Sequence, residues 1–208
     1  MGKIKEDIKN LSKEAGSKTK ARRAAEKWFE DASKSKRDNS VASHSKPFKT
    51  GMIHVFRYEK PKNIKTLEWW DMNPVVLALD PHDSGTDVGI NLNLLPVEFK
   101  EDLLDMIYDR MAGAIKSNSG RAKENNATTQ AQIKLIYKDV KKVLVQFGFD
   151  FAIRQYIPQL KKDQKVVSYE NWAKIALCDF QDLKGIGINE VKRMYRDHLK
   201  SLPKRKDI

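Results

Sequence analysis

The strongest constraint on the fold is a change in the spacing of apolar residues along the chain. From residue 52 to residue 95 they alternate with polar residues or form short continuous runs, which is typical of β-strands. From residue 96 onward they recur every three or four positions, which is typical of amphipathic helices. Strands followed by helices predict an α+β fold, with a small antiparallel β-sheet or partly closed barrel and then a helical C-terminal half.

Three strands are expected in this first region. Met52 to Tyr58 and Val88 to Leu95 alternate apolar and polar residues, whereas Pro74 to Leu79 is continuously apolar and contains β-branched residues. The intervening segments, EKPKNIK and DPHDSGT, are rich in residues that favour turns. Val166 and Val167 fit a further short strand.

The helical part begins at Pro96, since proline suits the first turn of a helix. From there the apolar stripe predicts a helix to Ile115. Further helices are expected over residues 130–147, over 151–160 with Pro158 ending or kinking it, over 169–178 behind an N-cap at Ser168, and from Asn189 toward Leu199.

The N-terminal residues 1–49 are predicted to form a basic arm and linker, separate from an α+β body with a basic tail over 50–208. Residues 21–29 (ARRAAEKWF) predict an amphipathic basic helix that docks on a partner or on the body. Apart from such helical stretches, these 49 residues show no core pattern. Residues 32–47 are rich in serine and lysine and predict a flexible linker.

The net charge of +12 lies at the two ends of the chain. Residues 1–49 hold 14 Lys/Arg against 7 Asp/Glu, and residues 192–208 hold 7 against 2. Residues 50–191 hold 19 of each and are neutral. A neutral body with cationic ends fits a protein that contacts a polyanion, either nucleic acid or an acidic protein surface. The plain alternative is that basic ends only aid solubility.

Residue patterns for catalysis are weak, so we expect no enzyme, no cofactor and no metal. The four histidines are scattered, and no dinucleotide-binding, P-loop or nucleophile-elbow motif is present. The single Cys178 excludes an internal disulfide and suits a core position. Asp and His at 80–83 (DPHD) could bind a metal, but these are ordinary turn residues. The enzymatic alternative is a metal-dependent nuclease that uses Asp80, Asp83 and Asp87.

Two further features have both a DNA-binding and a structural interpretation. Trp69 and Trp70 either pack at the edge of the core or expose one ring that stacks on a base. The segment LKGIGINEV at 183–191 is either a tight turn or a helix-hairpin-helix turn whose backbone N–H groups approach a phosphate. The predicted nucleic-acid contacts are Lys18, Lys20, Arg22, Arg23 and Lys27 at one end, and Lys184, Gly185, Gly187, Lys192, Arg193 and Arg196 at the other.

The segments GMIHVFRYEKPK, LEWWDMNPVVLAL and GINLNLLP carry a family resemblance, which IRQYIPQL at 153–160 and ENWAKIALCDFQDLKG at 170–185 extend. The pattern is similar to that of DNA end protector-like virion proteins of large contractile-tailed bacteriophages. It departs at DPHDSGTDV, at the GIG turn and at Asn93, where a histidine is expected. The matching positions are Gly51, Met52, Tyr58, Pro61, Lys62, Leu67, Trp69, Trp70, Asp71, Pro74, Gly89, Ile90, Asn91, Leu92, Leu95 and Pro96.

The resemblance implies a virion protein that shields the ends of the packaged genome from host exonuclease. It implies no catalytic residue. The charged N-terminus and the single cysteine predict synthesis in the host cytoplasm. The expected partners are double-stranded DNA or DNA ends and other virion proteins of the neck, head or tail. No membrane partner is expected, because no apolar run approaches the ~18 residues that span a bilayer. The alternative is a structural tail or baseplate component with no DNA contact, whose basic arms thread between subunits.

Overall fold

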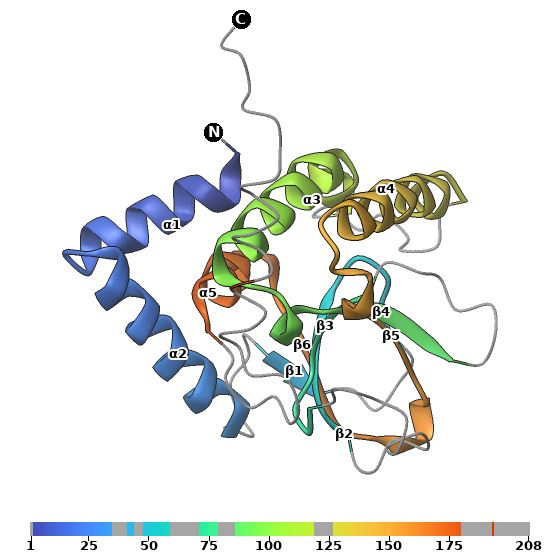
Figure 1. The fold of residues 1–208 in the computed structure, drawn as a ribbon, viewed down its shortest axis with the longest axis horizontal. Helices are drawn as coiled ribbons and strands as arrows, with labels where there is room; N and C mark the ends of the chain where they lie inside the picture. The colour runs from blue at the N-terminus through green and yellow to red at the C-terminus, as the bar shows by residue number, and fades with distance from the viewer. Residues whose placement is uncertain are drawn as a thin grey trace, which may run out of the picture.

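The computed structural model describes residues 2–34, 41–43, 48–58, 71–78, 86–118, 127–179 and 193. These residues form helices and a sheet that are interleaved in the chain (Figure 1). In chain order the elements are α1 (Lys3–Glu14), α2 (Lys18–Lys34), β1 (Val41–Ser43), β2 (Ile53–Tyr58), β3 (Val75–Leu77), β4 (Asp87–Asn91), α3 (Val97–Asn118), α4 (Ala127–Gln146), β5 (Ile153–Tyr156), β6 (Lys161–Val167) and α5 (Trp172–Leu177).

The six strands of the described residues form one antiparallel sheet in the order β1-β6-β2-β3-β4-β5. Strand β6 lies between β1 and β2, and its Val167 is paired with both Val41 and Ile53. The sheet is open, with β1 at one edge and β5 at the other. The α+β prediction is therefore confirmed, with the sheet rather than the barrel.

The prediction of a helix over residues 151–160 is wrong. Ile153–Tyr156 form strand β5, which pairs with β4, and single 3-10 turns lie on either side at 150–152 and 158–160. Short apolar runs do not distinguish a strand from a helix by periodicity alone, and β4 offers an edge with unpaired backbone groups. The strand expected at Val166 and Val167 is confirmed and extends back to Lys161. The C-terminal half is therefore only partly helical.

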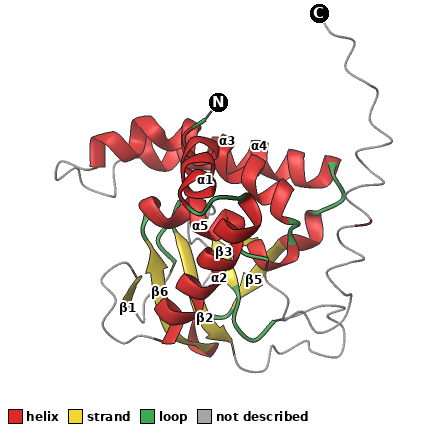
Figure 2. Cartoon of the chain, turned by 90° about the vertical axis from the view of Figure 1, so that its left-hand side faces the viewer, coloured by secondary structure: helices red, strands yellow, loops and turns green. Residues whose placement is uncertain are grey.

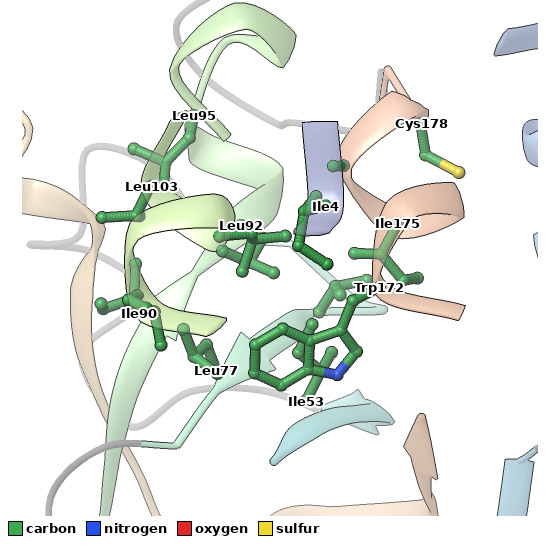
Figure 3. Close-up of a cluster of buried hydrophobic side chains, with 14 of the residues drawn as sticks. Ile4, Ile53, Leu77, Ile90, Leu92, Leu95, Leu103, Trp172, Ile175 and Cys178 are labelled. Carbon is green, nitrogen blue, oxygen red and sulfur yellow. The ribbon is translucent and has the colours of Figure 1, made fainter. Parts of the chain in front are cut away.

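Side-chain alternation divides the core between the two faces of the sheet. One face carries Ile53, Val55 and Leu77 into the larger cluster, where the fully buried Trp172 of α5 packs among them (Figure 3). The opposite face buries a smaller aromatic cluster around Phe56. The members of this smaller cluster are Phe48, Phe56, Tyr58, Val76, Ala78 and Tyr156.

Helices α1 and α2 are part of the main core, so the expectation that residues 1–49 lack a core pattern is wrong. Ile4, Ile8, Ala21 and Ala25 are each at most 5% exposed. They pack against α3 and α5 on the side that faces the viewer in Figure 2. Alanine side chains are small, so these helices can approach their neighbours closely. They lack the stripe of large apolar residues by which a core-facing helix is most easily predicted from sequence.

The linker prediction is also wrong where it overlaps β1. Residues 41–43 pair with β6 instead of forming a flexible connection. Since β6 would otherwise present an unpaired edge there, three residues of extended backbone are enough to gain hydrogen bonds. The domain boundary after residue 49 remains a prediction.

Candidate nucleic-acid interface

The outer side of α2 presents three cations together. Lys20, Arg23 and Lys27 fall within about 60° of one another around the helix axis, at 3.6 residues per turn. They lie opposite the buried alanines Ala21 and Ala25, and all three are exposed. None of them forms an ion pair with a described residue. We call Lys20, Arg23 and Lys27 the α2 cationic face.

The other two predicted contacts in this helix turn toward α3. Lys18 Nζ lies 2.8 Å from Glu101 Oε2, and Arg22 Nη2 lies 3.8 Å from Glu98 Oε1. Both acids belong to the first turns of α3, where the helix dipole favours negative charge. The structure thus brings Lys20, Arg23 and Lys27 together on the outside and places Lys18 and Arg22 in the contact between α2 and α3.

Contacts with α5 and with Asp179, just after it, hold α2 in place. Glu26 Oε1 accepts a hydrogen bond of 3.2 Å from the backbone N–H of Asp179. The Lys174 ammonium lies 4.8 Å from the centre of the Trp28 ring. A cationic face held by such contacts binds an anion with less loss of conformational entropy than a free arm would.

Most of the predicted C-terminal contacts lie outside the described residues. Of the six, only Arg193 is described, and it is helical and exposed. The candidate DNA-contacting and nuclease residues that lie outside the described ranges are Trp69, Trp70, Asp80, Asp83, Lys184, Gly185, Gly187, Lys192 and Arg196.

A second basic surface, which was not predicted from the sequence, lies on α4. Lys138, Lys141 and Lys142 are all exposed, and their spacing places them on one side of the helix. None forms an ion pair with a described residue. The charge count over residues 50–191 did not indicate these lysines, because positive and negative residues are equal in number over that segment. The lysine spacing of three and four positions was the signal that could have found them.

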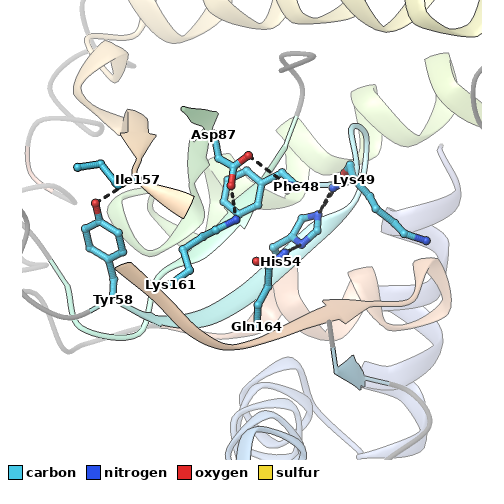
Figure 4. Close-up of polar contacts among 8 residues, drawn as sticks. All are labelled: Phe48, Lys49, His54, Tyr58, Asp87, Ile157, Lys161 and Gln164. Atoms are coloured by element: carbon cyan, nitrogen blue, oxygen red, sulfur yellow. Dashed lines mark hydrogen bonds and ion pairs between the residues drawn. The ribbon is translucent and has the colours of Figure 1, made fainter. Parts of the chain in front are cut away.

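The possible nuclease residue Asp87 is held in a buried structural contact. Its carboxylate pairs with the Lys161 ammonium and accepts a 3.1 Å hydrogen bond from the backbone N–H of Phe48 (Figure 4). The side chains of Asp87 and Lys161 are 0% and 3% exposed, and Lys161 Nζ lies 4.1 Å from the centre of the Phe48 ring. Within the described ranges no group of three or more His, Cys, Asp or Glu side chains is arranged to bind a metal ion.

Cys178 is a core residue, as expected. It is 1% exposed, and burial raises the pKa of its thiol to about 12, which disfavours the nucleophilic thiolate. Its backbone carbonyl accepts a hydrogen bond from the buried Lys100 ammonium, which places a cation at the C-terminal end of α5. Burial lowers the pKa of Lys100 to about 8.

His54 lies in the same buried region as Asp87 and makes stability depend on pH. The ring is fully buried, with Nδ1 2.9 Å from Gln164 Nε2 and Nε2 2.9 Å from the Lys49 nitrogen. Burial lowers the pKa of His54 to about 4. As the pH falls below about 6.5, the unfolded chain therefore binds a proton that the folded protein excludes, and stability is lost until about pH 4.

The His54 contribution is expected to be about 3 kcal/mol at its full size. Urea unfolding of the wild type and of His54→Gln at pH values between about 4 and about 7 measures it, since all other titrating groups are shared. The variant should show the shallower decline in acid. Parallel curves for the two proteins would contradict this assignment.

Several positions of the family pattern support the fold. Gly51 has φ of +78°, which favours glycine, and a Cβ on Gly89 would lie 2.8 Å from the Leu77 carbonyl oxygen. Asp71 Oδ2 accepts hydrogen bonds from Asn91 Nδ2 at 2.7 Å and from Asn93 Nδ2 at 3.2 Å. Asn93, the departure from the pattern, therefore joins a network that ties the residues before β3 to the end of β4.

Among the helices of the described segments, none is both long enough and apolar enough to cross a membrane.

Comparisons with known proteins identify the family. No curated protein and no solved structure matches the chain. The model of the family described as Phage T4 terminal DNA protecting protein matches residues 1–195, a range that includes the basic helices α1 and α2 as well as the whole sheet. The expected resemblance is thereby confirmed, and the chain belongs to the Phage T4 terminal DNA protecting protein family.

Proposed function

We propose that the protein binds double-stranded DNA without sequence preference at the ends of a phage genome and protects these ends by steric occlusion. The observation that carries this proposal is the α2 cationic face, which is exposed, backed by the buried side of the same helix and free of acidic partners among the described residues. The family's role in protecting terminal DNA supports the choice of DNA ends as the partner.

The spacing of the cations suits contact with a phosphate backbone. Lys20 and Lys27 are separated by about 10 Å along the helix at a rise of 1.5 Å per residue. Successive phosphates of one strand advance by about 3.4 Å along a DNA helix, so the face matches about three of them. Phosphate contacts position a protein without reading bases, which suits genome ends of any sequence.

The folded body then acts as a block beside the DNA terminus. An exonuclease must enclose or thread the strand end, and a sheet with its covering helices occupies the space that the enzyme requires. No bond is made or broken by the protein in this mechanism. We place the protein in the virion with neighbouring virion proteins as further partners, after synthesis in the host cytoplasm.

The proposal is tested by exonuclease digestion of linear duplexes of two unrelated sequences. Both should be protected equally at low salt. With about three phosphate contacts, affinity should fall about 40-fold between 50 mM and 200 mM salt. An unlabelled linear duplex should relieve protection at a lower concentration than a closed circle of equal length. Equal competition would exclude a preference for ends, and no retention on DNA at low salt would favour a tail or baseplate component.

A further inference from the structure

The outer side of α4 combines exposed apolar and cationic side chains. Leu135 and Val145 are 65% and 56% exposed, and Met72 at 40% is the only other large apolar side chain exposed among the described residues. Lys138 and Lys142 lie between them at helical spacing, so that the four side chains form one continuous row. We call Leu135, Lys138, Lys142 and Val145 the α4 outer row.

Neither lysine of this row pairs with a described residue. The opposite side of α4 is core, since Ile136, Val140 and Leu144 are at most 7% exposed. Asp139 is paired with Arg110 of α3, with 2.6 Å between Oδ2 and Nη1, so its charge is compensated by that cation. The row, with Lys141 beside it, is left cationic and apolar.

Resting on the proposed role in the virion, we propose that the α4 outer row docks on an acidic surface of another virion protein. Lysines at this site attract carboxylates. A DNA backbone would offer the exposed leucine and valine no apolar partner, and DNA interfaces are strongly polar and positive. A protein interface has an apolar core and a polar rim, so a protein partner can cover Leu135 and Val145 while its carboxylates meet the lysines.

The position of α4 allows both contacts at once. Figure 1 places α2 and α4 on opposite sides of the molecule, with α3 between them. A protein held by its partner through α4 therefore presents the α2 cationic face to DNA. The two surfaces divide the tasks of retention in the particle and coverage of the genome end.

The test is a neutral variant, Leu135→Gln with Val145→Gln, introduced into the phage that encodes the protein. Glutamine keeps the net charge and favours helix, so fold and DNA affinity should be unchanged, the latter within about twofold. The amount of protein per purified particle should fall at least about fivefold, as truncation of interface anchors predicts. Met72→Gln is the matched control, because it removes an exposed apolar side chain elsewhere and should leave incorporation unchanged.

A photoreactive residue at position 145 identifies the contacted molecule within purified particles. The expected product joins this chain to a virion protein at an acidic site. Normal incorporation of the double variant would overturn the proposal, and so would a DNA adduct or a parallel loss of DNA affinity, since either would make α4 a DNA surface. Failure of the wild-type protein to bind DNA would refute the proposed function while leaving the incorporation result intact.

Discussion

Replacement of Lys20, Arg23 and Lys27 by glutamine is expected to weaken binding to duplex DNA about 500-fold at 0.1 M salt. Each phosphate contact contributes about 0.9 to the slope of log affinity against log salt, so three contacts contribute about 2.7. A slope of about 2.7 changes the affinity about 500-fold over the tenfold range between 0.1 M and 1 M salt. The three residues are exposed on one side of α2, and glutamine is a good helix former, so the fold should be retained. Fluorescence anisotropy of a labelled duplex over a salt series measures both affinity and slope.

The matched control replaces Lys138, Lys141 and Lys142 by glutamine. This variant loses the same net charge from a surface on the other side of the molecule. Its salt slope should remain that of the wild type, because no direct phosphate contact is removed. Equal losses for the two triple variants would show that DNA affinity follows net charge alone and not the α2 cationic face.

Lys161→Met is expected to lower the free energy of unfolding by about 3–5 kcal/mol, because it leaves a buried carboxylate without its cation. Asp87 is fully buried, and the hydrogen bond that it accepts from the Phe48 N–H does not neutralise its charge. A loss of this size is a large fraction of the free energy of unfolding of an ordinary domain, which is about 5–15 kcal/mol. Urea unfolding monitored by circular dichroism measures it.

The double variant Lys161→Met with Asp87→Asn separates the charge from the packing. Asparagine keeps an oxygen that accepts from the Phe48 N–H but carries no charge, so the double variant should recover much of the lost stability. Lys161→Met alone within about 1 kcal/mol of the wild type would contradict a stabilising role for the pair.

Local patterns predicted the strands at β2, β3 and β4 and the helices α3 and α4, because each depends on neighbours in the chain. The strand expected over Val88 to Leu95 is wrong at its end, since β4 stops at Asn91 and Leu92–Leu94 form a 3-10 turn. The grouping of Lys20, Arg23 and Lys27 also follows from helical spacing within one element. Contacts between elements that are distant in the chain could not be predicted from these local patterns. That Lys18 meets Glu101, or that β6 lies beside β2, depends on which surfaces meet after folding.

The family pattern indicated the right family but not the candidate site. Gly89 and Asn91 occupy close-packed or hydrogen-bonded positions of the sheet, where few side chains fit. The α2 cationic face depends only on positive charge at suitable spacing, which many sequences satisfy. A resemblance based on the sheet therefore identifies the scaffold, while the candidate DNA contacts had to come from charge and exposure.

Strand β6 comes late in the chain but lies inside the sheet, between β1 and β2. The sheet therefore cannot be completed until residues 161–167 have been synthesised. Val167 pairs with Val41 and Ile53, and Trp172 of α5 fills the core beneath α1 and α2. Such long-range pairing slows folding, and a ribosome makes the basic N-terminal helices well before the segments that hold them. A chain interrupted before residue 161 would expose an unpaired β2 edge, a template for aggregation. Partial products would lack the framework that orients α2, so under the proposed function only a finished chain would protect a genome end.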